Sequence, residues 1–485
     1  MNLCELTFAS HMAVEDTPEI LSFRCPDTGL LIWPLLRGQY FELLLFSIHY
    51  RNLLMRSRGR IIDYARALKA LPQTCLHNFS RSAESSADVL IMASGAGHFN
   101  RQCRSFNRIT DYFALEAPHN TLCIEGLFDS RVPRNRWNTN VLYYLPWQGL
   151  IDLTGKLSRR SRHLEIARNM VDHISRRTSE MLDLHLTEPQ CAGLAALTAV
   201  KIARLPAMLD VYSSILDKVR PKLILLEQGC YTDLGVFNLV ARGKGIRIAE
   251  PQHGMVSRGH YAYMFAETLR QDVEFKSYLP HDFLGYGNWW NSQINAPVNK
   301  VVIGHPHHAE QRRGMAPFLG KRARVLLLSD GFELEKYVDL AISLKAMTGS
   351  LFEIVLRPHP LERQHAHNSL TELESVGVKL DSQPDIYSSL QTAYAVVGEV
   401  STGLFEAIGL AGHIYIWTTT KSVFGCPVHP FIGFGEADEL AAYLRTPPTP
   451  PAVSVDDIWA PGWQRNYSNF LHEALELRCS AEHET

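Results

Sequence analysis

The sequence predicts an α/β protein with two domains built on parallel sheets, and three observations lead to this prediction. The chain has 485 residues, enough for two to three domains of about 150 residues each. From about residue 206 onward, short aliphatic runs alternate with helical patterns, as they do in βαβ units. A polar stretch at 310–322 interrupts this alternation, which then restarts, so we expect the division between the domains near residue 310.

The first domain is expected to cover residues 1–305. A buried-strand candidate at 222–227 is followed by a helical pattern over 233–242, which ends at Gly243 and Gly245. Further strands are expected at 246–250 and 300–304. Residues 1–150 contain scattered apolar runs without a clean period, so they are assigned to this domain only as an elaboration of it.

The second domain is expected over residues 306–445, followed by a linker and a helix over 446–485. Aliphatic strand candidates occupy 324–328, 352–356, 378–380, 394–397 and 413–417. Helical patterns separate them at 335–347, 386–393 and 403–410. The proline-rich segment 446–451 cannot continue a helix, because proline lacks the amide donor. The last helical pattern, at 464–477, is expected to pack back across the hinge.

The charge balance and the cysteines limit the class of protein. Lys and Arg number 48 against 50 Asp and Glu, so a net charge of −2 gives no support to a general nucleic-acid binder. The nine cysteines include no C-x-x-C pair, which indicates reduced thiols rather than a disulfide framework or a zinc ribbon. The first twenty residues lack the apolar core of a signal peptide. We therefore expect a cytoplasmic protein that is soluble or peripheral on the membrane.

One local run of charge departs from this balance. Residues 156 to 177 carry seven basic side chains against only Glu165 and Asp172. A basic excess of this kind can hold a protein on anionic lipid, where each charge contributes about 1 kcal/mol. A solvated helix face is the alternative interpretation.

Polar motifs follow the predicted strands. They are Glu227-Gln228-Gly229, Gln252-His253-Gly254, Ser329-Asp330-Gly331, Arg357-Pro358-His359-Pro360 and Glu399-Val400-Ser401-Thr402. In open parallel sheets, ligands bind beyond the carboxyl ends of the strands. The placement of the motifs therefore predicts an enzyme whose site lies in a cleft between two Rossmann-like domains.

Two of these motifs indicate an anion site in the second domain. Pro358 and Pro360 restrict the loop, so the imidazole of His359 can donate to a phosphate or protonate a leaving group. The Ser401 and Thr402 hydroxyls stand at a predicted helix N-terminus, and Glu406 lies one turn further on, where it can accept both hydroxyls of a ribose. The alternatives are a strand-terminating turn at His359 and an ordinary helix cap at Ser401.

The order and spacing of the motifs resemble those of a known enzyme group. The succession is Gln252-His253-Gly254, Gly287-Asn288-Trp289-Trp290, Val302-Ile303-Gly304-His305-Pro306, Arg357-Pro358-His359-Pro360, and Ser401-Thr402 with Glu406-Ala407. Over roughly residues 205–420 it resembles the bacterial GT-B glycosyltransferases that build capsule, O-antigen and related surface polysaccharides, including those of lipopolysaccharide. The wider group includes Kdo transferases, polysialyltransferases and the glycerophosphotransferases of teichoic acid synthesis.

The resemblance implies roles for individual residues. On the donor side it implies that Arg357, His359, Ser401, Thr402 and Glu406 bind the nucleotide phosphates and ribose, and we place Ser329 beside them at the end of the preceding strand. On the acceptor side, Gln252-His253-Gly254 matches the histidine pattern of some members, whereas Glu227-Gln228-Gly229 departs from the acidic pattern of others. His253 is therefore the first choice for the general base, and Glu227 is the second. The alternative is that His253 only caps a turn.

The reaction expected from this resemblance is direct, inverting transfer of a sugar from a nucleotide-activated donor, with a weak preference for a CMP-linked acidic sugar. The acceptor is expected to be a surface polysaccharide or a lipid-linked glycan. No metal or other cofactor is expected, because the sequence contains no evident D-x-D, Walker A, H-E-x-x-H or dinucleotide motif. A CDP-alcohol phosphotransferase, a nucleotide-sugar 2-epimerase and a non-catalytic assembly protein remain as alternatives. Trp289 and Trp290 can stack on a sugar, but adjacent helical residues point in different directions, so core packing of at least one is expected.

Overall fold

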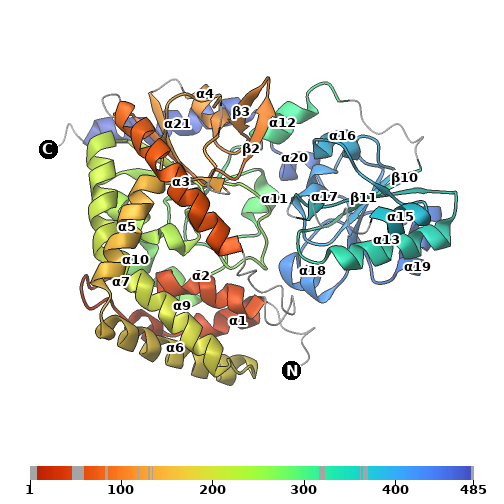
Figure 1. Cartoon of the computed structure of the whole chain (residues 1–485). Coiled ribbons are helices and arrows are strands. Elements are labelled where there is room, and N and C mark those ends of the chain that lie inside the picture. The colour runs from red at the N-terminus through yellow and green to blue at the C-terminus, as the bar shows by residue number, and fades with distance from the viewer. Residues whose placement is uncertain are drawn as a thin grey trace.

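The computed structural model describes residues 8–45, 59–81, 86–117, 120–128, 131–133, 135–315, 323–360, 362–363 and 370–481. Two α/β domains lie side by side, the first running from red to green and the second from teal to blue in Figure 1. The chain passes between them at α12 (Pro306–Arg312) and returns through α20 (Val455–Ile458). The α/β architecture with two Rossmann-like domains, predicted from the sequence as GT-B, is confirmed.

The first domain contains a seven-stranded parallel sheet with the strand order β5-β4-β1-β6-β7-β8-β9. Numbered within the sheet this is 3-2-1-4-5-6-7, so the order reverses between β1 and β6, as in Rossmann folds. The strands are β1 Val89–Ala93, β4 Thr121–Glu125, β5 Val141–Tyr143, β6 Leu223–Leu226, β7 Arg247–Pro251, β8 Asp282–Gly285 and β9 Asn299–Val302. A short antiparallel hairpin, β2 His98–Arg101 and β3 Arg104–Asn107, follows β1.

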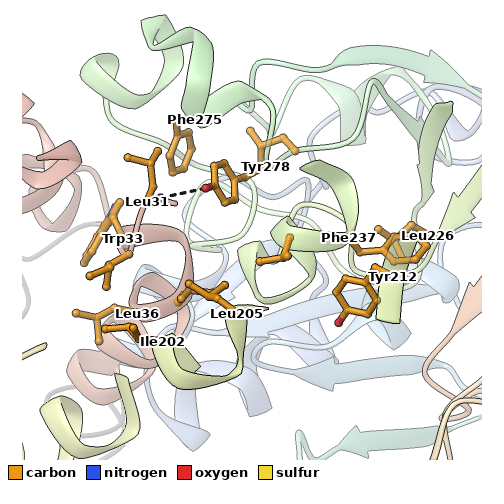
Figure 2. Packing of buried hydrophobic residues seen from close by; sticks show 14 of the residues in the cluster. Leu31, Trp33, Leu36, Ile202, Leu205, Tyr212, Leu226, Phe237, Phe275 and Tyr278 are labelled. Atoms are coloured by element: carbon orange, nitrogen blue, oxygen red, sulfur yellow. Dashed lines mark hydrogen bonds between the residues drawn. The ribbon is translucent and has the colours of Figure 1, made fainter. Parts of the chain in front are cut away.

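Helices cover one face of this sheet. They are α1 Phe8–Glu15, α2 Trp33–Leu44, α3 Gly59–Ser80, α5 Leu145–Ser158, α6 Ser161–Leu182, α7 Glu188–Val219 and α8 Gly235–Gly243. Figure 2 shows Leu36 of α2 beside Ile202 of α7 in the resulting core. A fully buried ion pair between Arg37 and Glu15, at 2.7 Å, joins α2 to α1.

The opposite face of the sheet is covered by a helix from the end of the chain. Alternate residues of β1 point to the two faces, so that Leu90 packs with α7 while Ile91 packs with α21 (Trp463–Ala481). From α21, Trp463, Tyr467 and the residues one and two turns further on fill this second core. The last helix therefore belongs structurally to the first domain, and Figure 1 shows it in blue beside α4.

The second domain has a six-stranded parallel sheet in the order β12-β11-β10-β13-β14-β15, which is again 3-2-1-4-5-6. The strands are β10 Arg324–Leu328, β11 Glu353–Arg357, β12 Lys379–Leu380, β13 Ala395–Gly398, β14 His413–Trp417 and β15 Ile432–Phe434. One face packs on α13 Leu334–Thr348, α15 Leu370–Ser375 and α19 Ala437–Arg445. The other face packs on α16 Ile386–Leu390 and α17 Thr402–Glu406.

One hydrophobic cluster, built around Trp290, includes residues of both domains. Trp290 of α11 (Asn288–Asn291) lies between Phe405 of α17 and Trp459, with ring centroids 4.5 and 5.7 Å away. Its indole nitrogen donates to the Ile458 carbonyl at 2.9 Å. Trp290 is thus a core residue, as expected for at least one of the pair, and Trp289 packs on Phe405 at 4.8 Å.

Helix α7 is the one helix in the described ranges that is long and apolar enough to cross a membrane. Its apolar residues pack against α2, α5, α6 and α8, as they would in the core of a soluble domain. The remaining short elements are η2 Pro18–Leu21, α4 Asp111–Glu116, η6 Thr232–Leu234, α9 Glu267–Gln271, α10 Val273–Lys276 and α18 Thr420–Gly425.

Candidate active site

A cavity of about 40 Å³ lies between the two domains. The first domain contributes Arg108, Ile109, Phe113, Gln252, His253, Gly254, Tyr286, His305 and Pro306, and the second contributes Thr402 and Glu406. Most of these residues follow the carboxyl ends of β7, β8, β9 and β13. The five polar motifs singled out in the sequence also follow strand ends, those of β6, β7, β10, β11 and β13.

His253 stands in this pocket above a buried carboxylate. Its Nδ1 lies 3.7 Å from Oε1 of Glu250, a residue of β7 that is fully buried. At this distance the contact is electrostatic rather than a hydrogen bond, and Nδ1 has no hydrogen-bond partner in the described part of the chain. The Glu250 carboxylate is positioned to stabilise a positive charge on the imidazole.

Glu250 is held in place by two further donors. The backbone amide of Cys230 donates to it at 2.7 Å, and the Tyr263 hydroxyl donates at 2.9 Å. Burial raises the pKa of Glu250, and the neighbouring His253 opposes that rise. The sequence did not predict a role for Glu250, because in the sequence this residue is only the last one of a predicted strand.

The two neighbours of His253 have different surroundings. Gln252 is buried, accepts a hydrogen bond from the Tyr286 amide at 2.8 Å, and donates to the Gly254 carbonyl at 2.9 Å. It therefore fixes the loop that carries His253. Gly254 lines the pocket, but its φ lies outside the left-handed region and a Cβ there would meet no atom within 4 Å. The turn at His253 thus does not depend on a conformation reserved for glycine.

Glu227, the second candidate base, is not among the residues that line the pocket. It is buried at the point where the strand order of the first sheet reverses. Both of its carboxylate oxygens are engaged by Ser94, one by the backbone amide and one by the hydroxyl, each at 2.7 Å. In this arrangement Glu227 joins the ends of β1 and β6.

Glu406 and Thr402 reach the pocket from the second domain. Helix α17 has only five residues, and Ser401 caps it by accepting a bond from the Gly403 amide at 3.2 Å. Ser401 itself is outside the pocket lining. Burial raises the pKa of Glu406, while Arg108, Tyr387 and Arg357 act to lower it.

Arg108 is the basic residue that faces Glu406, and no local sequence pattern predicted its role. It follows the hairpin strand β3, and its own amide donates to the Gly97 carbonyl at 2.9 Å. Among the described residues, no hydrogen-bond acceptor engages its guanidinium, which is exposed to solvent in the pocket. Its charge lowers the pKa values of Glu406 and of His359, so it acts on the second domain from the first.

The loop that carries Arg108 is anchored by a buried charge network. Arg136 pairs with Asp111 at 2.7 Å and with Glu125 at 3.1 Å. Asp111 also accepts the amide of Asn107 at 2.8 Å. The backbone on both sides of Arg108 is therefore fixed to the first sheet.

His359 lies just outside the pocket lining, over the end of β10. Its backbone amide donates to the Ser329 hydroxyl at 2.8 Å, and that hydroxyl in turn donates to Glu362. A Cβ on Gly331, where φ is +94°, would lie 2.8 Å from Nδ1 of His359, so the close approach requires glycine. Burial lowers the pKa of His359, which keeps the imidazole neutral near pH 7.

The Arg357 guanidinium donates hydrogen bonds to other residues of the second domain. It donates to Asp381 at 2.5 Å and to the Gln383 carbonyl at 3.1 Å, and the side chain is buried. It is not among the residues that line the pocket. Of the predicted donor-binding residues, the structure brings Thr402 and Glu406 into the pocket, places His359 and Ser329 beside it, and leaves Arg357 in a supporting position.

A second buried charge network, which the sequence did not predict, lies where the strand order of the second sheet reverses. The buried Lys421 ammonium lies 2.5 Å from both Asp330 and Glu399 and 3.1 Å from Glu333. These carboxylates raise the pKa of Lys421 against the opposing effect of its burial. The network fixes the ends of β10 and β13 relative to each other.

In the described ranges, no group of three His, Cys, Asp or Glu side chains is arranged to hold a metal ion. Metal independence, expected from the sequence, stays a prediction. Two histidines at the start of α12 make aromatic contacts: His305 stacks on Tyr286 at 4.0 Å and the buried His308 stacks on Trp459 at 4.4 Å.

No protein-family model and no curated protein sequence matches the chain. Among solved structures, it is similar to the UDP-GlcNAc 2-epimerase of Methanocaldococcus jannaschii, with 11% identity, a TM-score of 0.43, and coverage of 79% of this chain and 99% of that one. The Neisseria meningitidis UDP-GlcNAc 2-epimerase gives 10% identity, a TM-score of 0.41, and coverage of 80% and 99%. The wall teichoic acid polymerase TagF gives 10% identity, a TM-score of 0.39, and coverage of 86% of this chain and 93% of that one. These similarities assign no residue role and no activity to this chain, whose architecture rests on its own strand order.

Proposed function

We propose that the protein is a glycosyltransferase that moves a sugar from a nucleotide-activated donor to an acceptor hydroxyl, with inversion and without a metal. The observation that carries the proposal is the pocket itself. It sets His253 of one Rossmann-like domain opposite Thr402 and Glu406 of the other, with the Arg108 guanidinium directed into the same space. A histidine base, a carboxylate for ribose hydroxyls and a cation for phosphate are the groups that this reaction requires.

The proposed step is one displacement. The acceptor oxygen forms a bond to the anomeric carbon as the bond from that carbon to the phosphate oxygen breaks, and the nucleotide leaves with the bonding pair. The acceptor proton passes to Nε2 of His253, because Nδ1 faces Glu250. The Glu250 carboxylate then stabilises the imidazolium at 3.7 Å.

On the donor side, the Arg108 guanidinium would neutralise the departing phosphates, the His359 imidazole would donate a hydrogen bond to them, and Glu406 would accept hydrogen bonds from the ribose hydroxyls. The Thr402 and Ser401 hydroxyls would contribute hydrogen bonds at the same edge. Arg357 would act as a positioning residue, because its guanidinium holds Asp381 under the loop that carries His359. The donor class best supported by the motif resemblance is a CMP-linked acidic sugar.

For the acceptor we propose a surface polysaccharide or a lipid-linked glycan, handled on the cytoplasmic face of the membrane. The basic run at 156–177 offers part of an anionic-lipid contact. Within it, Arg162 pairs with Asp27 and Arg177 donates to the Ala13 carbonyl at 2.8 Å, whereas Lys156, Arg159 and Arg160 are exposed.

The experiment that tests the function starts with thermal shift against CMP, CDP, UDP and GDP. A nucleotide that binds only the folded protein raises its apparent stability by RT ln(1 + [L]/Kd). Matching activated donors are then incubated with and without acceptor, and the products are identified by mass spectrometry. Sugar transfer only with acceptor supports the proposal. Transfer of an alcohol phosphate supports the phosphotransferase alternative, epimerised donor without acceptor supports the epimerase, and no binding of any nucleotide contradicts an enzyme of this class.

A further inference from the structure

The outer face of helix α3 carries large apolar side chains in contact with water. Leu68, Leu76 and Phe79 are between 70% and 80% exposed. Pro72 and Cys75 lie between them on the same side of the helix and are also exposed. The spacing of three, four and seven residues places these side chains on one stripe. The inner face carries Ala70 and Thr74, which are buried.

Helix α5 repeats this pattern. Leu150 and Leu153 are more than half exposed, and Leu157 is 80% exposed. They too recur at helical spacing, opposite the buried Ile151 and Gly155, which face the core and α7. An amphipathic helix that points leucines outward on a folded domain is not explained by the packing of that domain.

The two stripes form one surface. Helices α3 and α5 pack side by side, as Figure 1 shows, and Gly149 of α5 lies against Leu71 of α3. With 100° of rotation per residue, Leu71 lies at the edge of the apolar stripe of α3, and Gly149 lies at the edge of the apolar stripe of α5. The two stripes therefore adjoin on the outward side of the contact between the helices. We name this surface the α3–α5 face. Its apolar members are Leu68, Pro72, Leu76, Phe79, Leu150, Leu153 and Leu157.

The described charges on and around the α3–α5 face are mainly basic. Residues 65–81 include no Asp or Glu, and Arg66 and Lys69 are exposed there. On α5, Lys156 is exposed, and Arg159 and Arg160 follow the end of the helix. The single acidic residue of α5, Asp152, pairs with Arg204 at 3.0 Å. An apolar centre with a mainly basic border is complementary to an anionic lipid surface.

The face is also rigidly attached to the sheet. His77 of α3 bonds the Val141 carbonyl at 2.8 Å. Asn78 donates to the Tyr143 carbonyl at 2.8 Å and accepts the Tyr143 amide at 2.9 Å. Both partners belong to β5, so a contact made by α3 fixes the orientation of the whole first domain.

We propose that the α3–α5 face docks the protein on an anionic bilayer, with its leucines and Phe79 in the headgroup boundary and its lysines and arginines at the lipid phosphates. The proposal deepens the peripheral-membrane part of the proposed function by naming the surface. It does not require that the cleft transfer a sugar. It assigns the contact to α3 and α5 rather than to the basic side chains of α6.

The test is co-sedimentation of the full chain with vesicles of 70% phosphatidylcholine and 30% phosphatidylglycerol, against phosphatidylcholine alone. Lys156→Gln with Arg159→Gln removes two charges, and we expect the partition coefficient to fall about 30-fold at low salt, at about fivefold per charge. Leu153→Ser with Leu157→Ser should lower it at least about tenfold. The matched controls are Arg168→Gln with Arg176→Gln on α6, and Val273→Ser with Leu351→Ser, which are exposed elsewhere.

The proposal is overturned if the unmodified protein stays in the supernatant, or if the α6 variant loses as much binding as the α5 charge variant. It is also overturned if the chain forms a concentration-dependent dimer that Leu153→Ser with Leu157→Ser abolishes, since a second copy would then cover the face. Nucleotide affinity, measured by calorimetry on the same variants, reports whether the fold and cleft are intact. Absence of nucleotide binding in every variant would contradict the proposed function and leave the vesicle result standing.

Discussion

Replacing Arg108 with Gln should weaken nucleotide binding, because this residue brings to the interdomain pocket a positive charge that no acceptor in the described part of the chain engages. A charge-assisted hydrogen bond contributes roughly 1.5–3 kcal/mol, which corresponds to about 10- to 150-fold in Kd. The Arg108 side chain is itself solvent-exposed, so screening places the expected loss near the lower end, at about tenfold. The backbone is fixed by the Gly97 carbonyl and by the network of Arg136 and Asp111, so the substitution should leave the fold intact.

The assay is calorimetric titration with the nucleotide that gives the largest thermal shift. Arg104→Gln is the matched control, since Arg104 is an exposed arginine on the same hairpin and does not line the pocket. The affinity loss should shrink as salt is raised, because the Arg108 contact is electrostatic and partly screened. Equal affinities for the two variants, or a loss that does not change with salt, would refute the assignment of Arg108 to the phosphate.

Three further predictions concern the cleft. His253→Ala should lower kcat by about 10²–10⁴-fold with nucleotide affinity unchanged, whereas Glu227→Gln should lower kcat less than about tenfold. Steady-state kinetics showing the reverse order would make Glu227 the base. Replacement of the exposed His472 with Ala is the control. His359→Ala should weaken nucleotide binding by about tenfold or more and leave the melting temperature nearly unchanged, which calorimetry and thermal denaturation check together. Burial raises the pKa of Glu406, so the folded protein favours the protonated carboxyl group. The stability that this group contributes is complete below its pKa in the unfolded chain and is lost as pH rises through its pKa in the folded protein. Glu406→Gln should therefore melt higher than the unmodified protein at pH 7–8 and no higher near pH 4, whereas exposed Glu436→Gln should show no such trend.

The sequence predicted the second sheet better than the first, for a physical reason. Strands β10 and β14 were predicted at the bounds that the structure gives, because each is a short, mainly apolar run followed by polar residues. In the first domain, three long helices, α5 to α7, separate β5 from β6. Strands β1, β4 and β5 were therefore not predicted, because they lie in a region without βαβ alternation. Strands β8 and β15, of four and three residues, were also missed.

The site was predictable where it depends on local chain order and not where it depends on tertiary contact. His253, Thr402 and Glu406 follow strands directly, and the pocket includes all three. Arg108 follows a two-stranded hairpin, and Lys421 is brought to Asp330 and Glu399 from more than twenty residues away. Neither position has a local pattern that distinguishes it from a surface cation. Arg357 illustrates the converse, since its place at a strand end did not reveal that Asp381 takes up its guanidinium.

The position of α21 has a consequence for the order in which the protein is made. Residues Trp463 to Leu475 cover one face of the first sheet, whose own strands end at residue 302. The second domain has all of its strands once residue 434 has been synthesised, and its last packing helix ends at Arg445. A nascent chain that has left the ribosome up to that point therefore has a complete second domain beside a first domain in which one apolar sheet face lacks its C-terminal helix. We expect the second domain to reach its native core before the first, against the usual N-to-C order of folding during synthesis. A chain released a few dozen residues early would expose that face and be a substrate for chaperones and proteases.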